Sequence, residues 1–242
     1  MRVLAVIPAR LASTRLARKP LREIAGRPML AYVYEAARRS PLLGADDVLI
    51  ATDSDEIVSL GRERGWNVRL TSAQHRSGTE RICEVGRAIP ADVYLNIQGD
   101  EPLTRPEHVA ALLEVMRDAS VQVGTLKTPA TPEDVNNPNA VKVTTDLAGR
   151  ALYFSRAAIP YDRDGTGEGR YFKHLGFYAY RPEALAKFCG WPESPLERSE
   201  RLEQLRFLEN GVDIHVGETP FDTIGVDTED DLRRAERILL AR

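Results

Sequence analysis

The first twenty residues constrain the fold of this chain more than any other segment. An apolar run at positions 3–7 is too short to span a membrane and has the length of a buried strand. Pro8 ends the run, and the loop of small residues that follows carries Arg10, Arg15 and Lys19. Small side chains let a ligand approach the backbone N–H groups, and cations neutralise phosphate charge. A loop after the first strand of an open α/β sheet is a nucleotide site, although spacing alone favours a solvated basic loop equally.

The rest of the first half alternates between short apolar runs and helical patterns. We expect further strands at 48–51, 67–70 and 93–97, and helices at 27–40, from 55 onward and at 77–87. The opening loop matches neither a Walker loop nor a G-x-G-x-x-G fingerprint, so its phosphate cradle would be of another kind. Strand–helix alternation predicts an α/β fold with a doubly wound, mostly parallel, Rossmann-like sheet and helices on both faces.

The second half is less regular. Strand-like segments lie at 121–126, 140–145, 151–154 and 173–180. A helix is expected at 194–210, with a capping box at its start and Gly211 as its stop, and another at 228–240, capped by Thr228 and Asp231. The 242 residues fit one domain, 1–242, around one α/β core.

Charge and cysteine content exclude several classes of protein. The net charge of -3 disfavours nucleic-acid binding, and the crowding of cations near the N-terminus suits a local anionic ligand. Cys83 and Cys189 are the only cysteines, too few for a disulfide framework or a metal quartet. We expect two free thiols, which indicate a reducing compartment and a cytoplasmic protein. No stretch is long enough to cross a membrane.

Two aspartates stand at positions suited to a metal. Asp100 follows a predicted strand in Gln98–Gly99–Asp100, and Asp227 precedes the last predicted helix. Carboxylates at such an edge hold hard cations such as Mg²⁺. A turn or an N-cap is the alternative role for each, and the sequence does not show that the two converge.

Other candidate residues have equally ordinary alternatives. Ser77 is read as a helix cap, by about two to one, over a ligand contact. Arg156 suits a carboxylate clamp or an exposed ion pair, and His174, before alternating aromatic residues, is more often structural. Glu203 and Gln204 are adjacent on a predicted helix, so they point about 100° apart.

Several stretches together resemble the sugar-acid cytidylyltransferase family. The opening signature comprises Ile7–Pro8–Ala9–Arg10, Ser13, Arg15–Leu16 and Lys19–Pro20–Leu21. Later stretches narrow the resemblance to the 3-deoxy-manno-octulosonate (Kdo) branch: Ala51–Thr52–Asp53, Ser77–Gly78–Thr79–Glu80–Arg81, Asn96 to Pro102, Asn137 to Val143, Ala151 to Arg156, Ile159–Pro160–Tyr161, Lys173–His174–Leu175–Gly176, Leu202 to Arg206 and Gly225 to Thr228. The family often has proline where this chain has Ala17, so we expect a looser loop with the extra cation of Arg18 and unchanged chemistry.

The resemblance implies a nucleotidyltransferase that transfers CMP from CTP to the anomeric hydroxyl of Kdo, releases pyrophosphate and serves lipopolysaccharide biosynthesis. It assigns catalysis to Lys19, Asp100, Asp227 and Arg10, and Mg²⁺ binding to Asp100 and Asp227. CTP contacts fall on Ala9, Arg10, Arg15, Lys19, Ser77, Gln98 and Asp100. Sugar contacts fall on Gln98, Arg156, His174, Tyr178, Glu203 and Gln204.

The resemblance also implies a homodimer, with residues 152–180 as the segment of the sugar site and the interface, and no nucleic-acid or membrane partner. Two alternatives stay open at this point. The acceptor is another sugar acid, such as sialic acid or an amino-Kdo, or the chain binds CTP or a sugar acid without catalysis.

Overall fold

The computed structural model describes residues 1–12, 15–165 and 170–241 and divides the chain into two compact units. Unit 1 comprises residues 1–110 and 223–242, and unit 2 comprises residues 111–222. The division falls within helix α4 (Pro106–Val115). No helix among the described residues has the length and apolar character needed to cross a membrane.

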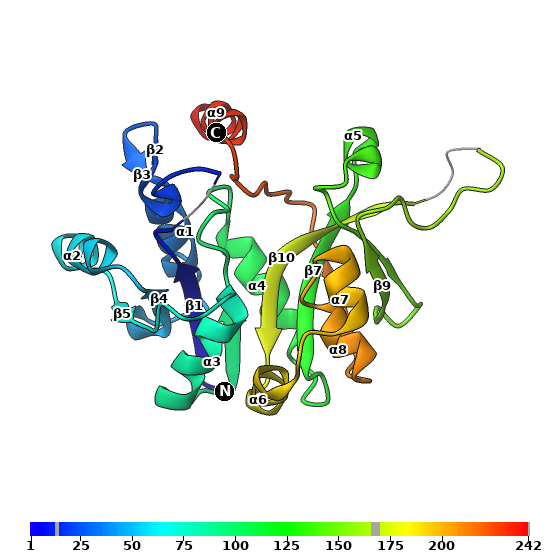
Figure 1. Ribbon diagram of the computed structural model, residues 1–242, viewed down its shortest axis with the longest axis horizontal. Coiled ribbons are helices and arrows are strands. Elements are labelled where there is room, and N and C mark those ends of the chain that lie inside the picture. Colours follow the sequence, from blue (N-terminus) through cyan, green and yellow to red (C-terminus); the bar gives the residue numbers. More distant parts are fainter. Residues whose placement is uncertain (13–14, 166–169, 242) are drawn as a thin grey trace. The chain divides into compact units, whose positions relative to one another are not determined.

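Unit 1 is built on a parallel sheet with the strand order β6-β1-β4-β5 (Figure 1). The strands are β1 (Val3–Ala9), β4 (Val48–Thr52), β5 (Val68–Leu70) and β6 (Val93–Asn96), connected through helices α1 (Met29–Arg38), α2 (Asp55–Arg64) and α3 (Gly78–Ala88). The chain steps outward from β1 to β5 and then returns to the other side of β1. Right-handed crossovers in opposite directions put helices on both faces, which confirms the predicted doubly wound sheet.

The apolar run after Arg2 forms the centre of this sheet. Leu4 to Ile7 are at most 2% exposed, because a parallel strand covered on both faces has no solvent side. The helix expected from position 27 begins at Met29, since Arg27–Pro28 forms strand β3 and pairs with β2 (Glu23–Ile24). Ala25 and Gly26 turn this hairpin with positive φ values of 47° and 74°. Short 3-10 turns η1 (Lys19–Leu21) and η2 (Ala45–Asp47) complete the connections.

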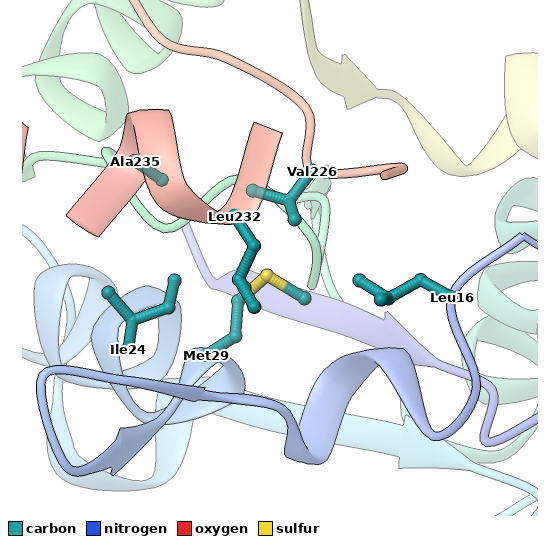
Figure 2. Packing of buried hydrophobic residues seen from close by; sticks show 6 residues of the cluster. All are labelled: Leu16, Ile24, Met29, Val226, Leu232 and Ala235. Atoms are coloured by element: carbon teal, nitrogen blue, oxygen red, sulfur yellow. The ribbon is translucent and has the colours of Figure 1, made fainter. Parts of the chain in front are cut away.

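The last helix of unit 1 returns from the far end of the sequence. Helix α9 (Glu229–Leu240) is capped by Thr228 with Asp231, as predicted. It packs beside the β2–β3 hairpin (Figure 1). Its Leu232 points toward Met29 in a buried cluster, shown in Figure 2, that consists of Leu16, Ile24, Met29, Val226, Leu232 and Ala235. This cluster joins the first thirty residues to the last twenty.

Unit 2 holds a mixed arrangement of strands. Strand β7 (Val123–Pro129) runs antiparallel to β10 (Phe172–Tyr180) and parallel to β11 (Ile214–Glu218), and β8 (Lys142–Thr145) pairs with β10 and with β9 (Ala151–Ser155). The β7–β10 register shifts between Leu175 and Tyr178. Helices α5 (Pro132–Asn136) and α6 (Pro182–Gly190) lie in the connections. Helices α4, α5 and α6 and strand β11 were not predicted from the sequence.

The helix expected at 194–210 is two helices, α7 (Pro195–Glu200) and α8 (Leu205–Glu209). The predicted capping box of Ser194 and Glu197 is present, but Arg201 takes a left-handed conformation with φ of 56° and ends α7. The freed carbonyl groups of Glu200 and Arg201 accept hydrogen bonds from Arg156. The contact from Arg156 therefore stabilises the break between α7 and α8, which the local sequence does not predict.

The expectation of two free thiols is wrong. Neither Cys83 nor Cys189 is free, because each is disulfide-bonded. Pairing depends on how a fold places Cβ atoms, which spacing along the sequence does not report.

Candidate active site

The carboxyl ends of β1 and β6 lie side by side at the point where the strand order of unit 1 reverses. In open α/β sheets this is where ligands bind. Two glycines make the local packing possible. A Cβ on Gly99 would lie 2.8 Å from the carbonyl oxygen of Pro8, and a Cβ on Gly78 would lie 3.0 Å from the Cγ of Pro8. The segment after β6 and the first turn of α3 therefore both close against the end of β1.

Asp100 and Asp227 converge on one atom. The Nζ of Lys19 donates to Oδ2 of Asp100 and, at 2.8 Å, to Oδ1 of Asp227. The carbonyl oxygen of Asp100 also accepts a hydrogen bond of 2.9 Å from the N–H of Val226. The structure thus brings together two carboxylates that are distant in sequence, and a backbone contact between their segments keeps them adjacent.

The ammonium of Lys19 is the most buried member of this group. Its side chain is 15% exposed, against 32% for Asp100 and 40% for Asp227. Burial disfavours the charge of Lys19, but the two carboxylates, Asp100 foremost, outweigh that cost and raise the pKa of Lys19 above its ordinary value. Lys19 is therefore a cation held by paired carboxylates, which is the charge arrangement a divalent cation would also satisfy.

The first loop supplies a second cation. Nη2 of Arg15 lies 3.0 Å from Oδ2 of Asp227, and both side chains are more than one third exposed. Leu16 and Val226, the neighbours of Arg15 and Asp227, are both buried in the cluster of Figure 2. The apolar cluster therefore anchors the backbone on each side of this ion pair, while the charged groups themselves face the solvent.

The remaining predicted nucleotide contacts lie around the end of β1. Ala9 is its buried last residue and Arg10 follows it, exposed. The Ser77 hydroxyl accepts from the N–H of Glu80 at 3.3 Å and caps α3, as the favoured interpretation predicted. Nε2 of Gln98 donates to Oδ1 of Asn96 at 3.2 Å. Ser13 of the opening signature lies outside the described residues.

Sequence reasoning missed a buried ion pair that supports the first loop. Nη2 of Arg81 lies 3.0 Å from Oδ2 of Asp53, and Oδ1 of Asp53 accepts from the N–H of Leu11 at 3.4 Å. Both residues stand in stretches that carried the family resemblance, but no local rule gave them a role. The feature of the sequence that could have identified this pair is Asp53, an aspartate directly after the strand that became β4.

Arg18, at the site where the loop departs from the family pattern, faces α2. It takes φ of 55° and its guanidinium pairs with Glu56. The extra cation is thus held by a carboxylate at the start of a neighbouring helix.

In unit 2, His174 lies half-buried among aromatic rings. Its ring centroid is 5.0 Å from that of Phe154 and 5.4 Å from that of Tyr178. Burial lowers the pKa of His174 to about 3, so the imidazole is neutral near pH 7 and suits hydrogen bonding to a hydroxyl. Nε2 lies 3.0 Å from Oγ1 of Thr125.

Arg156 binds backbone carbonyl groups. Its guanidinium donates to Glu200, Pro138 and Arg201 at 2.7, 2.9 and 3.4 Å. An arginine has five N–H donors, so part of its capacity is left for a ligand.

Glu203 and Gln204 lie in the link between α7 and α8, which corrects their predicted place within one helix. Gln204 is buried, and its Nε2 has no hydrogen-bond partner within the described part of the chain. A buried amide without a partner is costly unless a ligand or a water satisfies it.

Comparison with known proteins gives one consistent answer. A family model described as cytidylyltransferase matches residues 4–214. The chain is 68% identical over 242 residues to a protein from Koribacter versatilis (strain Ellin345), covering 100% of this chain and 92% of that protein. It is 57% identical to one from Acidobacterium capsulatum, covering 100% and 98%. Both relatives are named 3-deoxy-manno-octulosonate cytidylyltransferase.

Solved structures agree. The structure of CMP:2-keto-3-deoxy-manno-octonic acid synthetase complexed with CTP matches with a TM-score of 0.94 at 39% identity, covering 100% of this chain and 99% of that one. A cytidylyltransferase from Leptospira borgpetersenii, at 16% identity and a TM-score of 0.65, shares the fold.

Proposed function

This chain belongs to the 3-deoxy-manno-octulosonate cytidylyltransferase family, and we propose that it transfers CMP from CTP to the anomeric hydroxyl of Kdo, giving CMP-Kdo and pyrophosphate. The observation that carries the proposal is the 68% identity, over the whole chain, to a relative of that name. The convergence of Asp100, Asp227, Lys19 and Arg15 supports it, because these are the charges that such a transfer requires.

In this reaction the anomeric oxygen attacks the α-phosphorus of CTP. A phosphorus–oxygen bond forms to the sugar, and the bond from the α-phosphorus to the bridging oxygen breaks. Pyrophosphate leaves in line with the attack, and the hydroxyl proton passes to the solvent. Such transfers depend on positioning and on charge neutralisation more than on covalent help from the protein.

We assign Arg10, Arg15 and Lys19 to the triphosphate. Arg15 and Lys19 now bind Asp227, and phosphate oxygens would compete with that carboxylate for their donors. Because all three cations lie at or after the end of β1, they would also stabilise the charge that develops on pyrophosphate.

Asp100 and Asp227 fit a Mg²⁺ ion. Two carboxylates that already meet on one cation match the way magnesium binds in nucleotide sites, through one or two carboxylates with phosphates and waters in the remaining positions. No group of three or more potential ligands occurs among the described residues, so the protein alone would not enclose the ion. When bound, Mg²⁺ would neutralise phosphate charge and lower the pKa of the sugar hydroxyl.

Cytosine would be held at the end of β1, near Ala9, Ser77 and Gln98. The close packing of Gly78 and Gly99 against Pro8 supports this, because it gathers three backbone segments there. Backbone N–H and C=O groups would then distinguish the base.

We assign the sugar acid to Arg156, His174, Tyr178, Glu203 and Gln204 of unit 2. The buried Nε2 of Gln204 supports this assignment, since a sugar hydroxyl would satisfy it. The donor capacity left on Arg156 suits the carboxylate of Kdo.

We further propose a cytoplasmic homodimer that serves lipopolysaccharide biosynthesis. CTP as the substrate supports the location, whereas the disulfide-bonded state of Cys83 and Cys189 removes the support that free thiols would have given. Leu152 and Tyr161 are 63% and 86% exposed within the segment proposed as the interface, so contact with a second copy would cover them. Light scattering that shows a monomer at working concentration would reject the dimer.

The test of the function is pyrophosphate release by purified protein with CTP, Mg²⁺ and fresh Kdo. Sialic acid and an amino-substituted Kdo serve as parallel acceptors, and Asp100→Asn is the matched control. We expect release with Kdo from the parent protein alone. Release only with another acid would change the acceptor, and CTP binding without release from any acid would favour a binding protein.

A further inference from the structure

Thr125 is a buried residue of β7 that contacts His174 through its hydroxyl. Oγ1 lies 3.0 Å from Nε2 of His174, 2.7 Å from the carbonyl oxygen of Phe177 and 3.4 Å from that of Leu175. Thr125 has no measurable exposure, so water does not compete for this hydroxyl. It belongs to none of the stretches that carry the family resemblance, and the function above does not use it.

The three contacts decide which nitrogen of His174 carries the proton. A hydroxyl has one hydrogen to donate, and a carbonyl oxygen only accepts. The 2.7 Å contact between two oxygens therefore uses the hydrogen of Thr125, which points at Phe177. Oγ1 then has only lone pairs to offer to Nε2, so Nε2 donates and Nδ1 keeps its lone pair.

The backbone explains why Thr125 meets these groups. Leu175 precedes the shift of register in β10 and Phe177 lies within it, where the regular pairing with β7 is interrupted. Bulges of this kind redirect side chains beside functional sites. Thr125 stands opposite Tyr178 in the ladder, so its hydroxyl reaches the carbonyl oxygens of the shifted segment and His174 at the same time.

The surroundings of His174 leave no second tautomer of equal energy. Rings of Phe154 and Tyr178 pack against the imidazole and hold its plane. If Nδ1 carried the proton, Nε2 and Oγ1 would face each other with lone pairs while the hydrogen of Thr125 stayed on Phe177. The arrangement is therefore consistent with a single protonation state of a neutral ring.

We propose that Thr125 is a positioning residue that holds His174 in the Nε2–H tautomer, so that Nδ1 presents a hydrogen-bond acceptor to a hydroxyl of the sugar acid. The assignment of the tautomer stands on this structure, and its consequence for the sugar rests on the proposed function. Because a sugar hydroxyl can donate to Nδ1 but a carbonyl or carboxylate cannot, Thr125 would contribute to acceptor specificity without touching the acceptor.

The test combines nuclear magnetic resonance with kinetics. In protein labelled with ¹⁵N-histidine, two-bond proton–nitrogen spectra identify the bare and the protonated nitrogen of each ring. The chain has four histidines, and His174→Gln assigns the signals of His174 by their loss. The variants are Thr125→Val, which keeps the shape without the hydroxyl, and Thr125→Ser, which keeps the hydroxyl.

We expect Nε2–H at His174 in the parent protein and in Thr125→Ser, and a mixture of tautomers in Thr125→Val. We also expect the KM for Kdo to rise about tenfold in Thr125→Val, with the KM for CTP unchanged and with recovery in Thr125→Ser. Melting curves of both variants separate these effects from unfolding.

A parent protein with its His174 proton on Nδ1 would overturn the proposal, and this measurement does not depend on the folding of either Thr125 variant. An unchanged tautomer in folded Thr125→Val would overturn it too. Absence of pyrophosphate release from the parent protein with Kdo would instead reject the proposed function and leave the tautomer result standing.

Discussion

Lys19 and Arg15 of unit 1 are held in a different way from Lys142 of unit 2. In unit 1, Lys19 and Arg15 bind the carboxylates of Asp100 and Asp227, and these contacts are partly open to solvent. In unit 2, the ammonium group of Lys142 donates hydrogen bonds to three backbone carbonyl groups, those of Asn137, Ala140 and Arg156. One arrangement pairs side chains that can exchange partners, and the other fixes side chains to the backbone.

The difference suits two kinds of ligand. A triphosphate with its metal brings charges of its own, so a site of mutually paired cations and carboxylates can rearrange around it at low cost. A sugar acid carries one charge and several hydroxyl groups, which are distinguished by donors and acceptors of fixed direction. Backbone-bound arginine and an oriented neutral histidine provide such directions in unit 2.

The largest effect that would break the comparison is loss of an aspartate in unit 1. Asp100→Asn or Asp227→Asn removes a charge from the proposed metal site while keeping the shape. We expect kcat to fall by about a thousandfold, equivalent to about 4 kcal/mol, with the fold retained. Steady-state pyrophosphate release measures kcat, and a circular dichroism spectrum checks that the fold is retained. Unchanged activity would remove that residue from the metal site.

A buried ion pair in unit 2 should affect stability instead. Glu197 and Arg206 are 4% and 5% exposed, and Arg206 also lies over the ring of Phe188. Arg206→Met leaves a buried, unpaired carboxylate, which costs about 3–5 kcal/mol and lowers the melting temperature by on the order of 10 °C. Calorimetry measures the shift.

The double variant Glu197→Leu with Arg206→Met is the control for this pair. Removing both charges together should restore most of the lost stability. If each single variant melted like the parent protein, the pair would not be a fixed element of unit 2.

Lys19→Ala tests whether the ammonium group of Lys19 binds the triphosphate of CTP. We expect the KM for CTP to rise by about ten- to a hundredfold, since a charge-assisted contact contributes about 1.5–3 kcal/mol. The KM for Kdo should stay within error. A change in the Kdo dependence alone would contradict the assignment of the first loop, and Arg18→Ala, which removes the cation held by Glu56, is the matched control on the same loop.

The smallest expected effect concerns the pH dependence of stability in unit 2. The pKa of His174 is about 3 in the folded chain, below its ordinary value of 6.5. Between these two values the unfolded chain binds more protons than the folded chain. The contribution of neutral His174 to the free energy of unfolding is therefore fully present above pH 6.5 and is lost as the pH is lowered. At pH 5.5 the loss is about 1.4 kcal/mol. Urea titrations at pH 7.5 and 5.5 measure it, and a His174→Gln variant with the same pH dependence would show that another group is responsible.

The same contrast explains which features sequence reasoning could predict. Unit 1 follows simple periodic patterns: buried runs such as 3–7 and 48–51 admit little besides strands covered on both faces. Elements of unit 2 depend on distant contacts, as the break at Arg201 shows, where Arg156 binds the carbonyl groups that the helix gives up. Local propensity contains no record of such partners.

The candidate site divides along a similar line. Residue type and position, after a strand for Asp100 and before a helix for Asp227, were enough to single out the two aspartates, but their meeting at Lys19 depends on the fold. The support of Leu11 by Asp53 and Arg81 was not predicted, because neither spacing nor residue type distinguishes a supporting ion pair from a surface one.

The apolar cluster of Figure 2 has a consequence for how the protein is made. Leu16, Ile24 and Met29 leave the ribosome early, whereas Val226 and Leu232 are translated much later. At about 5–20 residues per second, the early part of unit 1 waits on the order of 10 s for them. During that time the nascent chain has the cations of its nucleotide loop but neither Asp227 nor the helix that covers the loop's apolar side. The proposed metal ligand Asp227 and helix α9 are therefore in place only after most of this sequence has been translated, and a chain cut before Asp227 would lack the proposed activity.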